Sequence, residues 1–193
     1  MPKTDEITLS TLQRPKNMEK QKPILFNENP PPKNIDGLYG YVIHNEEKIC
    51  GFFGKYFFLS NGKKCEIQEE QNPNIIYPYS ENAYQASKFE NINIRQQFQN
   101  IDFKDAIYLA WKLKNHIRMD WESVKTQRMK SILTQKFQNP TLKTLLEETQ
   151  NKYLEETNHW KDTFWGVCDG IGENILGKIL MEIREENRHK IML

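Results

Sequence analysis

Long apolar runs, clustered cysteines and a sizeable net charge are all missing from this sequence. Its three cysteines and four histidines are widely scattered, which argues against a disulfide framework and against a structural zinc site. No stretch approaches the roughly 20 apolar residues of a membrane helix, and the polar N-terminus lacks the apolar middle of a secretory signal. We therefore expect a cytoplasmic protein that needs no membrane and no metal.

Positive and negative charges nearly cancel. Lysine and arginine total 27 against 26 acidic residues, and the formal net charge of +1 excludes a global attraction to nucleic acid or to an anionic membrane. The cations are unevenly spread, because residues 81–139 hold ten of them against six acids, whereas residues 140–193 hold seven against ten. Any basic surface is therefore expected on the middle helices.

The composition suits one well-filled core. With 193 residues, of which 37% are hydrophobic, the chain is long enough for one domain and short for two. Residues 1–34 are mostly polar and contain three consecutive prolines at 30–32, which predicts a flexible or surface-hugging extension. Its single apolar triplet, 24–26, is expected to dock as a short edge strand. Residues 35–193 are predicted to form the domain.

The predicted fold class is mainly α, a compact helical domain with a small antiparallel β element near its N-terminal part. Two β-prone runs, 39–44 and 48–53, flank three polar residues, the length of a hairpin loop. A further apolar strand is expected to end at Ser60 and Asn61, and residues 63–74 are predicted to form a loop.

Apolar residues recur at helical spacing after residue 79. Helices are predicted from an N-cap at Ser80 to about Phe89, around 103–111, from 122 to the Asn139–Pro140 pair, shortly after that proline, and after Gly172. The positions expected to face the core are Phe103, Ala106, Ile107, Ala110, Trp111, Val124, Met129, Ile132, Leu133, Phe137, Leu142, Leu145, Leu146, Ile175, Leu176, Ile179, Leu180 and Ile183.

The predicted helix at 80–89 has an uneven distribution of side chains. At 100° per residue, one arc carries Glu81, Tyr84, Gln85 and Lys88, while small residues share the opposite side. Small residues allow close packing, so the polar arc is either an ordinary solvated face, the commoner case, or a site with a carboxylate and an amine.

A second dense segment, 159–174, combines Asp162 with three large aromatics and three glycines ahead of a helix. Such a turn suits phosphate binding at a helix N-terminus, although the glycine spacing matches neither a Walker loop nor a dinucleotide fingerprint. A plain loop remains open as an interpretation, and Trp160 and Trp165 are equally typical of core positions.

The order of these motifs resembles the NADAR, or YbiA-like, family. The resemblance spans about 53–184 and rests on FLSN (58–61), SENAYQASKF (80–89), DWESVK (120–125), Met129, KF (136–137), DTFWG (162–166) and GENILGKILMEIR (172–184). Two departures concern substrate choice: Asn82 stands where the family usually has histidine, and Gly62 where it usually has an aromatic residue.

The resemblance implies an N-glycosidase that hydrolyses the bond between ribose and a ring nitrogen. Two substrate classes come with the family: ADP-ribose on guanine bases in DNA, favoured here and with single-stranded DNA as the expected partner, and ribosylaminopyrimidine phosphates of riboflavin synthesis. A non-catalytic module that binds ADP-ribose or nucleotides is the third alternative. For DNA, the cations expected to contact phosphates are Lys112, Lys114, Arg118, Lys125, Arg128 and Lys130.

The resemblance also implies roles for site residues. Glu81 is expected to stabilise the positive ribose or activate water, Lys88 to form a Schiff base with the opened ribose, and Asp162 to protonate the leaving nitrogen or hold the ribose hydroxyls. No cofactor and no metal are required. Trp121 and Trp165 are expected to sandwich the base, and Gly166, Asn174 and the start of the last helix are expected to bind phosphate. The full set of expected substrate contacts is Phe58, Ser60, Asn61, Gln85, Trp121, Trp165, Gly166 and Asn174.

Overall fold

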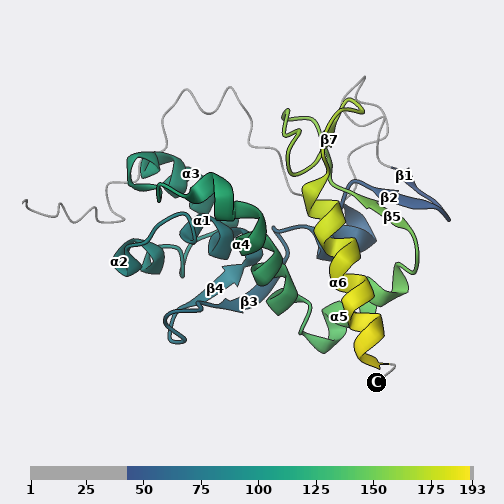
Figure 1. Cartoon of the computed structure of the whole chain (residues 1–193), viewed down its shortest axis with the longest axis horizontal. Coiled ribbons are helices and arrows are strands. Elements are labelled where there is room, and N and C mark those ends of the chain that lie inside the picture. The colour runs from purple at the N-terminus through teal and green to yellow at the C-terminus, as the bar shows by residue number, and fades with distance from the viewer. Residues whose placement is uncertain (1–42, 192–193) are drawn as a thin grey trace, which may run out of the picture.

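The computed structural model describes residues 43–191 (Figure 1). The predicted extension at 1–34, its expected strand at 24–26 and the start of the strand expected at 39–44 lie outside the described residues. No helix in the described range is long and apolar enough to cross a membrane.

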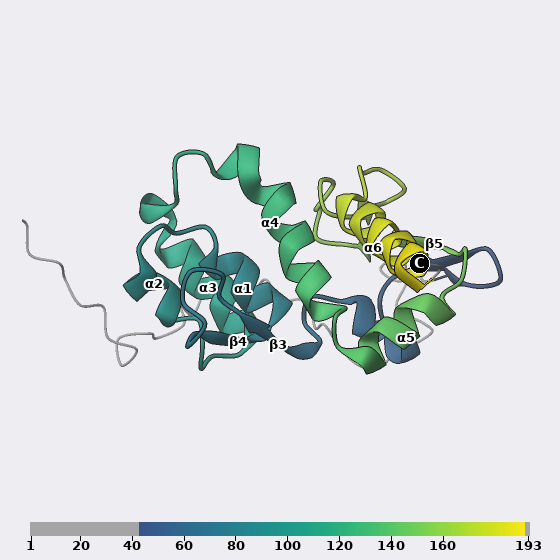
Figure 2. The same ribbon diagram turned by 60° about the horizontal axis from the view of Figure 1, so that its bottom comes forward.

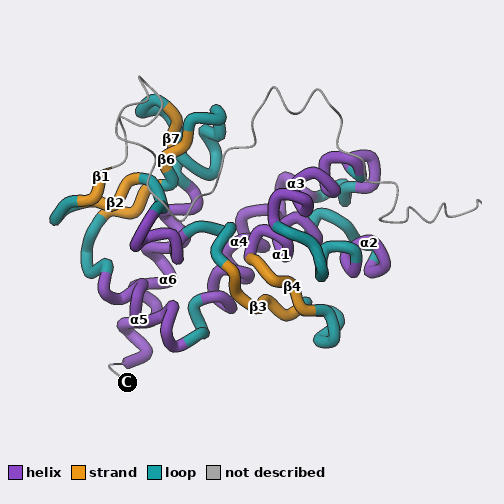
Figure 3. The backbone as a smooth tube through the Cα atoms, turned by 180° about the vertical axis from the view of Figure 1, so that it is seen from behind, coloured by secondary structure: helices purple, strands orange, loops and turns teal. Residues whose placement is uncertain are grey.

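The predicted hairpin is present and belongs to a larger sheet. Strand β1 (Ile43–His44) pairs antiparallel with β2 (Lys48–Cys50), which confirms the hairpin. On its other edge β2 pairs parallel with β5 (Tyr153–Glu155), far along the chain. A second parallel pair joins β6 (Thr157–Asn158) to β7 (Val167–Cys168). The β structure is therefore antiparallel only in part. Figure 3 shows where the strands lie among the helices.

Two local predictions before residue 80 are wrong. The segment expected to be an apolar strand is a 3-10 helix, η3 (Gly54–Leu59), because its consecutive apolar residues Phe57, Phe58 and Leu59 bury equally well in either conformation. The segment expected to be a loop contains β3 (Lys64–Gln68), paired antiparallel with β4 (Ile76–Tyr79). This sheet has two strands, so Pro78 sits at an edge, where a missing N–H is tolerated.

The predicted helices are confirmed, with corrected ends. They are α1 (Ser80–Ala86), α3 (Phe103–Lys112), α4 (Trp121–Lys136), α5 (Pro140–Glu148) and α6 (Ile175–Ile191). The short helices α2 (Ile92–Gln96) and η4 (Lys114–His116) were not predicted. Ser80 is the first helical residue rather than the N-cap, which is Tyr79 without a side-chain bond. Asn139 caps α5 by accepting from two backbone N–H groups.

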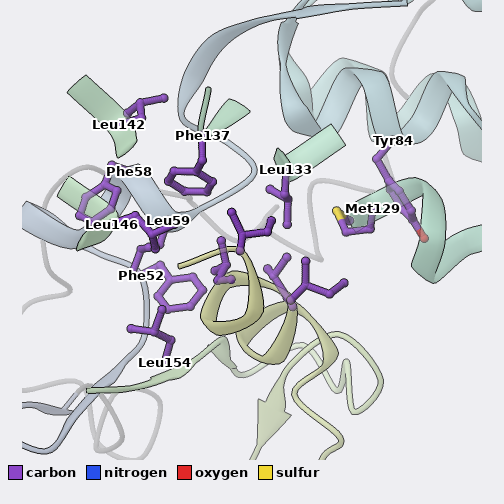
Figure 4. Packing of buried hydrophobic residues seen from close by; sticks show 14 of the residues in the cluster. Phe52, Phe58, Leu59, Tyr84, Met129, Leu133, Phe137, Leu142, Leu146 and Leu154 are labelled. Carbon is purple, nitrogen blue, oxygen red and sulfur yellow. The ribbon is translucent and has the colours of Figure 1, made fainter. Parts of the chain in front are cut away.

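The described chain has two hydrophobic clusters, and α1 and α4 lie between them (Figures 1 and 2). The first gathers η3, α5, α6 and the β1–β2–β5 sheet around α4, as Figure 4 shows for Leu133 and Phe137. The second packs α3 and the β3–β4 hairpin against the small residues of α1. Ile107 and Trp111 were expected in the core but are 40% and 55% exposed.

Candidate active site

Helix α1 is held on both sides, which aims its polar arc into the molecule. Ala83 and Ala86 are buried in the second hydrophobic cluster, as the small side of the predicted arc requires. Asn82 is fully buried, and its amide donates to the carbonyls of Phe98 (2.9 Å) and Ile101 (2.8 Å). The departure at Asn82 therefore ties α1 to the chain before α3, and the amide is used in that contact.

Glu81 is at the start of α1 and is held by its neighbours. Its backbone N–H donates to the Asn61 carbonyl (3.2 Å), and its Oε1 accepts from Gln85 Nε2 (2.7 Å). Burial raises the pKa of Glu81 and nearby Asp162 raises it further, whereas Gln85, Lys88 and Asn61 act in the opposite direction. The sequence-predicted acid and amine therefore share one electrostatic environment with Asp162.

Lys88, two residues beyond α1, is half-buried among aromatic rings. Its Nζ lies 5.5 Å from the ring centroid of Tyr84 and 5.8 Å from that of Trp121. Burial lowers the pKa of Lys88, while the negative charges of Glu81 and Glu122 raise it. A neutral amine is the nucleophilic form that a Schiff base requires, so burial favours the predicted role.

Asp162 orders the loop that faces α1. Its Oδ1 accepts the N–H groups of Phe164 (3.1 Å) and Trp165 (2.9 Å), and its own carbonyl accepts from Asn158 Nδ2 (2.7 Å). Both bonds at Oδ1 use the carboxylate as an acceptor. Asp162 therefore positions the loop in addition to acting electrostatically on Glu81.

Three aromatic rings, rather than two, line this region. Trp121 and Trp165 were expected to sandwich a base, and both contact Tyr84, with centroid distances of 5.2 and 5.4 Å. Tyr84 was noted in the polar arc but not assigned to the site. Burial raises the pKa of the Tyr84 phenol above its usual range, with a smaller contribution from Glu81. The rings give the site an apolar wall beside its charged groups.

Two buried charged residues were missed. Lys136, at the end of α4, is 1% exposed and donates from Nζ to the Ser60 carbonyl (2.8 Å), and burial lowers its pKa to about 8. Glu156, between β5 and β6, is buried beside Glu81 and Asp162. In the sequence Glu156 looks like one of two adjacent solvated acids. Lys136 was quoted only as part of a family motif.

We call five of these residues the active-site cluster: Glu81, Lys88, Lys136, Glu156 and Asp162. Asn61 Oδ1, Gln85 Oε1 and Glu156 Oε2 lie in or against this cluster, and each is buried without a hydrogen-bond partner among the described residues. Buried acceptors are normally paired, so three together suit a ligand that brings donors such as ribose hydroxyls. Within the described residues, no group of three or more His, Cys, Asp or Glu side chains is arranged to hold a metal ion.

Some predicted contacts lie elsewhere. Phe58 points into the first hydrophobic cluster beside Leu142 and Leu146 (Figure 4). The Ser60 hydroxyl accepts from the N–H of Gly62 (3.1 Å), so Ser60 reaches the cluster only through its carbonyl. Phe58 therefore packs in the hydrophobic core behind the candidate site and does not line the site.

The start of α6 does not present free donors to a phosphate. The N–H groups of Glu173, Asn174, Ile175 and Leu176 donate to carbonyls of the preceding loop at 163–166. The Asn174 side chain is also committed, since Oδ1 accepts from the N–H of Glu156 (3.1 Å) and Nδ2 donates to the Leu154 carbonyl (2.9 Å). The expectation of a phosphate site here is not supported.

Gly166 has a packing role. A Cβ at this position would lie 2.1 Å from the Glu156 carbonyl oxygen and 2.8 Å from Asn158 Nδ2, which real structures do not tolerate. The loop with Asp162 and Trp165 therefore approaches β6 closely because residue 166 has no side chain. Its predicted contact with substrate stays a prediction.

Comparisons with known proteins identify the family of the chain. The NADAR domain family matches residues 46–188. A Vibrio vulnificus protein named "Riboflavin biosynthesis protein VVA0006" is 36% identical over 132 residues, which cover 67% of this chain and 35% of that protein. The "N-glycosidase YbiA" of Shigella flexneri serotype 5b is 36% identical over 148 residues, covering 73% of this chain and 89% of that protein.

A solved structure is similar in fold as well. The NMR structure of the Escherichia coli protein YbiA superposes with a TM-score of 0.67 at 29% identity, covering 79% of this chain and 92% of that one. The family match spans both hydrophobic clusters and every residue of the active-site cluster. This chain belongs to the NADAR domain family.

Proposed function

We propose that this protein is an N-glycosidase that hydrolyses a bond between ribose and a ring nitrogen. The observation that carries the proposal is that Glu81, Lys88 and Asp162 share one electrostatic environment, beside buried hydrogen-bond acceptors without partners. The names of the YbiA relatives support the same reaction class.

The arrangement suits cleavage of an N-glycosidic bond. When the C–N bond breaks, its electron pair leaves with the base and positive charge develops on ribose. The Glu81 carboxylate stabilises that charge and takes a proton from the attacking water, whose oxygen bonds to the anomeric carbon. Ribose hydroxyls donate to the unpaired oxygens of Asn61 and Gln85, which fixes the sugar before the bond breaks.

For the substrate we favour a soluble ribosylaminopyrimidine phosphate over modified DNA. Four of the six cations expected to contact DNA are already ion-paired: Arg118 with Asp120, Lys125 with Glu122, Arg128 with Glu70, and Lys130 with Glu182 and Glu186. A phosphate chain would have to displace these acids, which reduces its electrostatic gain. The riboflavin name of the Vibrio vulnificus relative points the same way.

ADP-ribosyl guanine in single-stranded DNA is the second candidate, because one surface feature favours it. Trp111 is 55% exposed, and Lys114 Nζ lies 5.9 Å from its ring centroid. An exposed aromatic beside a lysine suits base stacking with phosphate contact. Arg118, four residues after Lys114, is next to the site, since its N–H donates to the Lys88 carbonyl (2.9 Å).

The test offers both substrates to the purified protein. Release of ribose phosphate from a ribosylaminopyrimidine phosphate, followed by chromatography, is the expected result. An oligonucleotide with ADP-ribose on one guanine is followed by mass in parallel, at several salt concentrations. Activity on DNA that falls steeply with salt would move the assignment to the second candidate.

One outcome would overturn the glycosidase, and another would overturn its proposed active site. No turnover of either substrate, with retained binding of ADP-ribose, would identify a binding module. Turnover that survives both Glu81→Gln and Lys88→Ala would place the active site elsewhere.

A further inference from the structure

Glu156 is a buried carboxylic acid whose position the backbone fixes on both sides. Its N–H donates to Asn174 Oδ1 (3.1 Å), and its carbonyl accepts from the N–H of Val167 (2.9 Å). A Cβ at residue 166 would lie 3.1 Å from Glu156 Cγ, so the glycine loop also closes over the side chain. The carboxyl group is therefore held in place before any ligand binds.

The surroundings of Glu156 disfavour its charged form. The side chain is 9% exposed, and Oε2 is buried with no hydrogen-bond partner among the described residues. Glu81 from α1 and Asp162 from the facing loop add negative charge, whereas Lys136 from α4 is the opposing cation. Burial first, and then these two acids, raise the pKa of Glu156 to about 8.

Asp162 differs from Glu156 in its contacts. Its Oδ1 accepts two backbone N–H groups and so holds the loop in place. Glu156 has no such donors on Oε2 and lies in the same electrostatic cluster. The fold therefore uses an oxygen of Asp162 to order the loop and leaves an oxygen of Glu156 without a partner.

We propose that Glu156 is a further catalytic residue, which holds a proton and gives it to the departing ring nitrogen. The proposal rests on the N-glycosidase function. As the C–N bond breaks, its electron pair goes to the nitrogen, which takes the Glu156 proton, and the new carboxylate is stabilised by Lys136. The proton that Glu81 takes from water then passes to Glu156, so the cycle closes without any other reactant.

The first test is Glu156→Gln, which keeps the size of the side chain and removes the transferable proton. We expect kcat on the cleaved substrate to fall by about 100-fold or more with KM little changed. We expect wild-type activity to fall above about pH 8, and this fall should be absent from the residual activity of Glu156→Gln. The matched control is Glu155→Gln, because the neighbouring Glu155 binds the Thr157 hydroxyl (2.8 Å) away from the cluster.

The second test needs no turnover. Infrared difference spectra at pH 7 should show the carbonyl stretch of a protonated carboxylic acid in the wild type and in Glu155→Gln, and not in Glu156→Gln. Inactivity of the wild type on both substrates would reject the glycosidase. The infrared spectrum would then still show whether Glu156 is protonated at pH 7. An active wild type whose kcat and pH profile are unchanged in Glu156→Gln would overturn the proposal, as would a wild-type spectrum without the band.

Discussion

Two of the buried polar clusters among the described residues differ in how completely their hydrogen bonds are made. In the Arg95 cluster (Glu69, Tyr77 and Arg95), Arg95 bonds to Glu69 Oε1 at 3.0 Å, and the Tyr77 hydroxyl donates to Glu69 Oε2 at 2.8 Å. None of these side chains is among the buried unpaired groups of the described residues. The active-site cluster, by contrast, has an unpaired Glu156 oxygen and unpaired amide oxygens beside it.

This difference teaches what each cluster does. A buried network with all its bonds made holds the β3–β4 hairpin to α2 and the chain around it, and it leaves nothing for a ligand to bind. A buried network with unpaired acceptors costs folding free energy, and it persists where a ligand supplies the missing donors. The first cluster should therefore respond to substitution in stability, and the second in activity.

Glu81→Gln should break the active-site cluster with the largest effect. The amide keeps the hydrogen bond with Gln85 but cannot take a proton from water, so kcat should fall by about 10²–10⁴-fold. Thermal unfolding should show no loss of stability, because a buried acid is removed. Glu148→Gln is the control, since Glu148 is exposed at the end of α5. Equal kcat values in the two variants would contradict the assignment.

Arg95→Met should break the Arg95 cluster. It leaves Glu69 buried without its cation, and we expect a loss of about 3–5 kcal/mol in the free energy of unfolding by urea. The folded fraction should keep its specific activity. Arg128→Met, which removes a more exposed ion pair with Glu70, should lose less than about 1 kcal/mol. Similar losses in both variants would show that burial of Glu69 does not matter.

A trapping experiment at Lys88 tests whether the active-site cluster forms a covalent intermediate, which the Arg95 cluster should not do. Attack by Lys88 is the covalent alternative to direct attack by water, in which its half-buried amine beside Glu81 forms a Schiff base with the opened ribose. Reduction with cyanoborohydride during turnover should then trap one ribosyl adduct, located at Lys88 by peptide mass spectrometry. Lys88→Arg should give no adduct, while Lys143→Arg, on α5, should trap it normally. An adduct that persists in Lys88→Arg would exclude this nucleophile.

The smallest expected effect is the change in the free energy of unfolding per pH unit. The pKa of Glu156 rises from its ordinary 4.5 to about 8 on folding, so the folded chain keeps a proton that the unfolded chain releases. Stability should therefore fall as pH rises from 4.5 to 8, by at most about 1.4 kcal/mol per pH unit, and this contribution should end above 8. In Glu156→Gln the slope over that range should be shallower, as urea unfolding at several pH values will show.

Lys136 gives the opposite sign in a separate window. Its pKa falls from 10.5 to about 8 on folding, so the unfolded chain holds a proton that the folded chain has lost. Its contribution to stability should rise between pH 8 and 10.5 and should be absent from Lys136→Met. A wild-type curve that is flat in both windows would contradict the burial of both groups.

What the sequence predicted well is local. The polar arc of α1 follows from the helical period alone, and Glu81, Gln85 and Lys88 do face the same region. The hairpin of β1 and β2 and the helix stop at Asn139–Pro140 likewise depend on a few adjacent residues. These features needed no information from distant parts of the chain.

What it missed depends on contacts between distant segments. Glu156 is buried because β5 pairs with β2 and the glycine loop closes over it, and neither contact leaves a periodic signal. The start of α6 has the composition of an anion-binding site. In the folded chain, however, its backbone N–H groups donate to the carbonyls of the loop at 163–166. The segment before Ser60 is a 3-10 helix and not the expected strand. The prediction failed because a continuous run of apolar residues has no period that distinguishes a strand from a helix.

The parallel pairing of β2 with β5 also bears on when the enzyme becomes active during its synthesis. Asn45 and Lys152, 107 positions apart, are joined by a hydrogen bond beside this pairing, and Glu156 follows directly after it. Closing so long a loop is slow and depends on residues that leave the ribosome late. Glu81 and Lys88 therefore leave the ribosome long before Glu156 and Asp162. A nascent or truncated chain that ends before Glu156 has only part of the active-site cluster, and we expect it to be inactive.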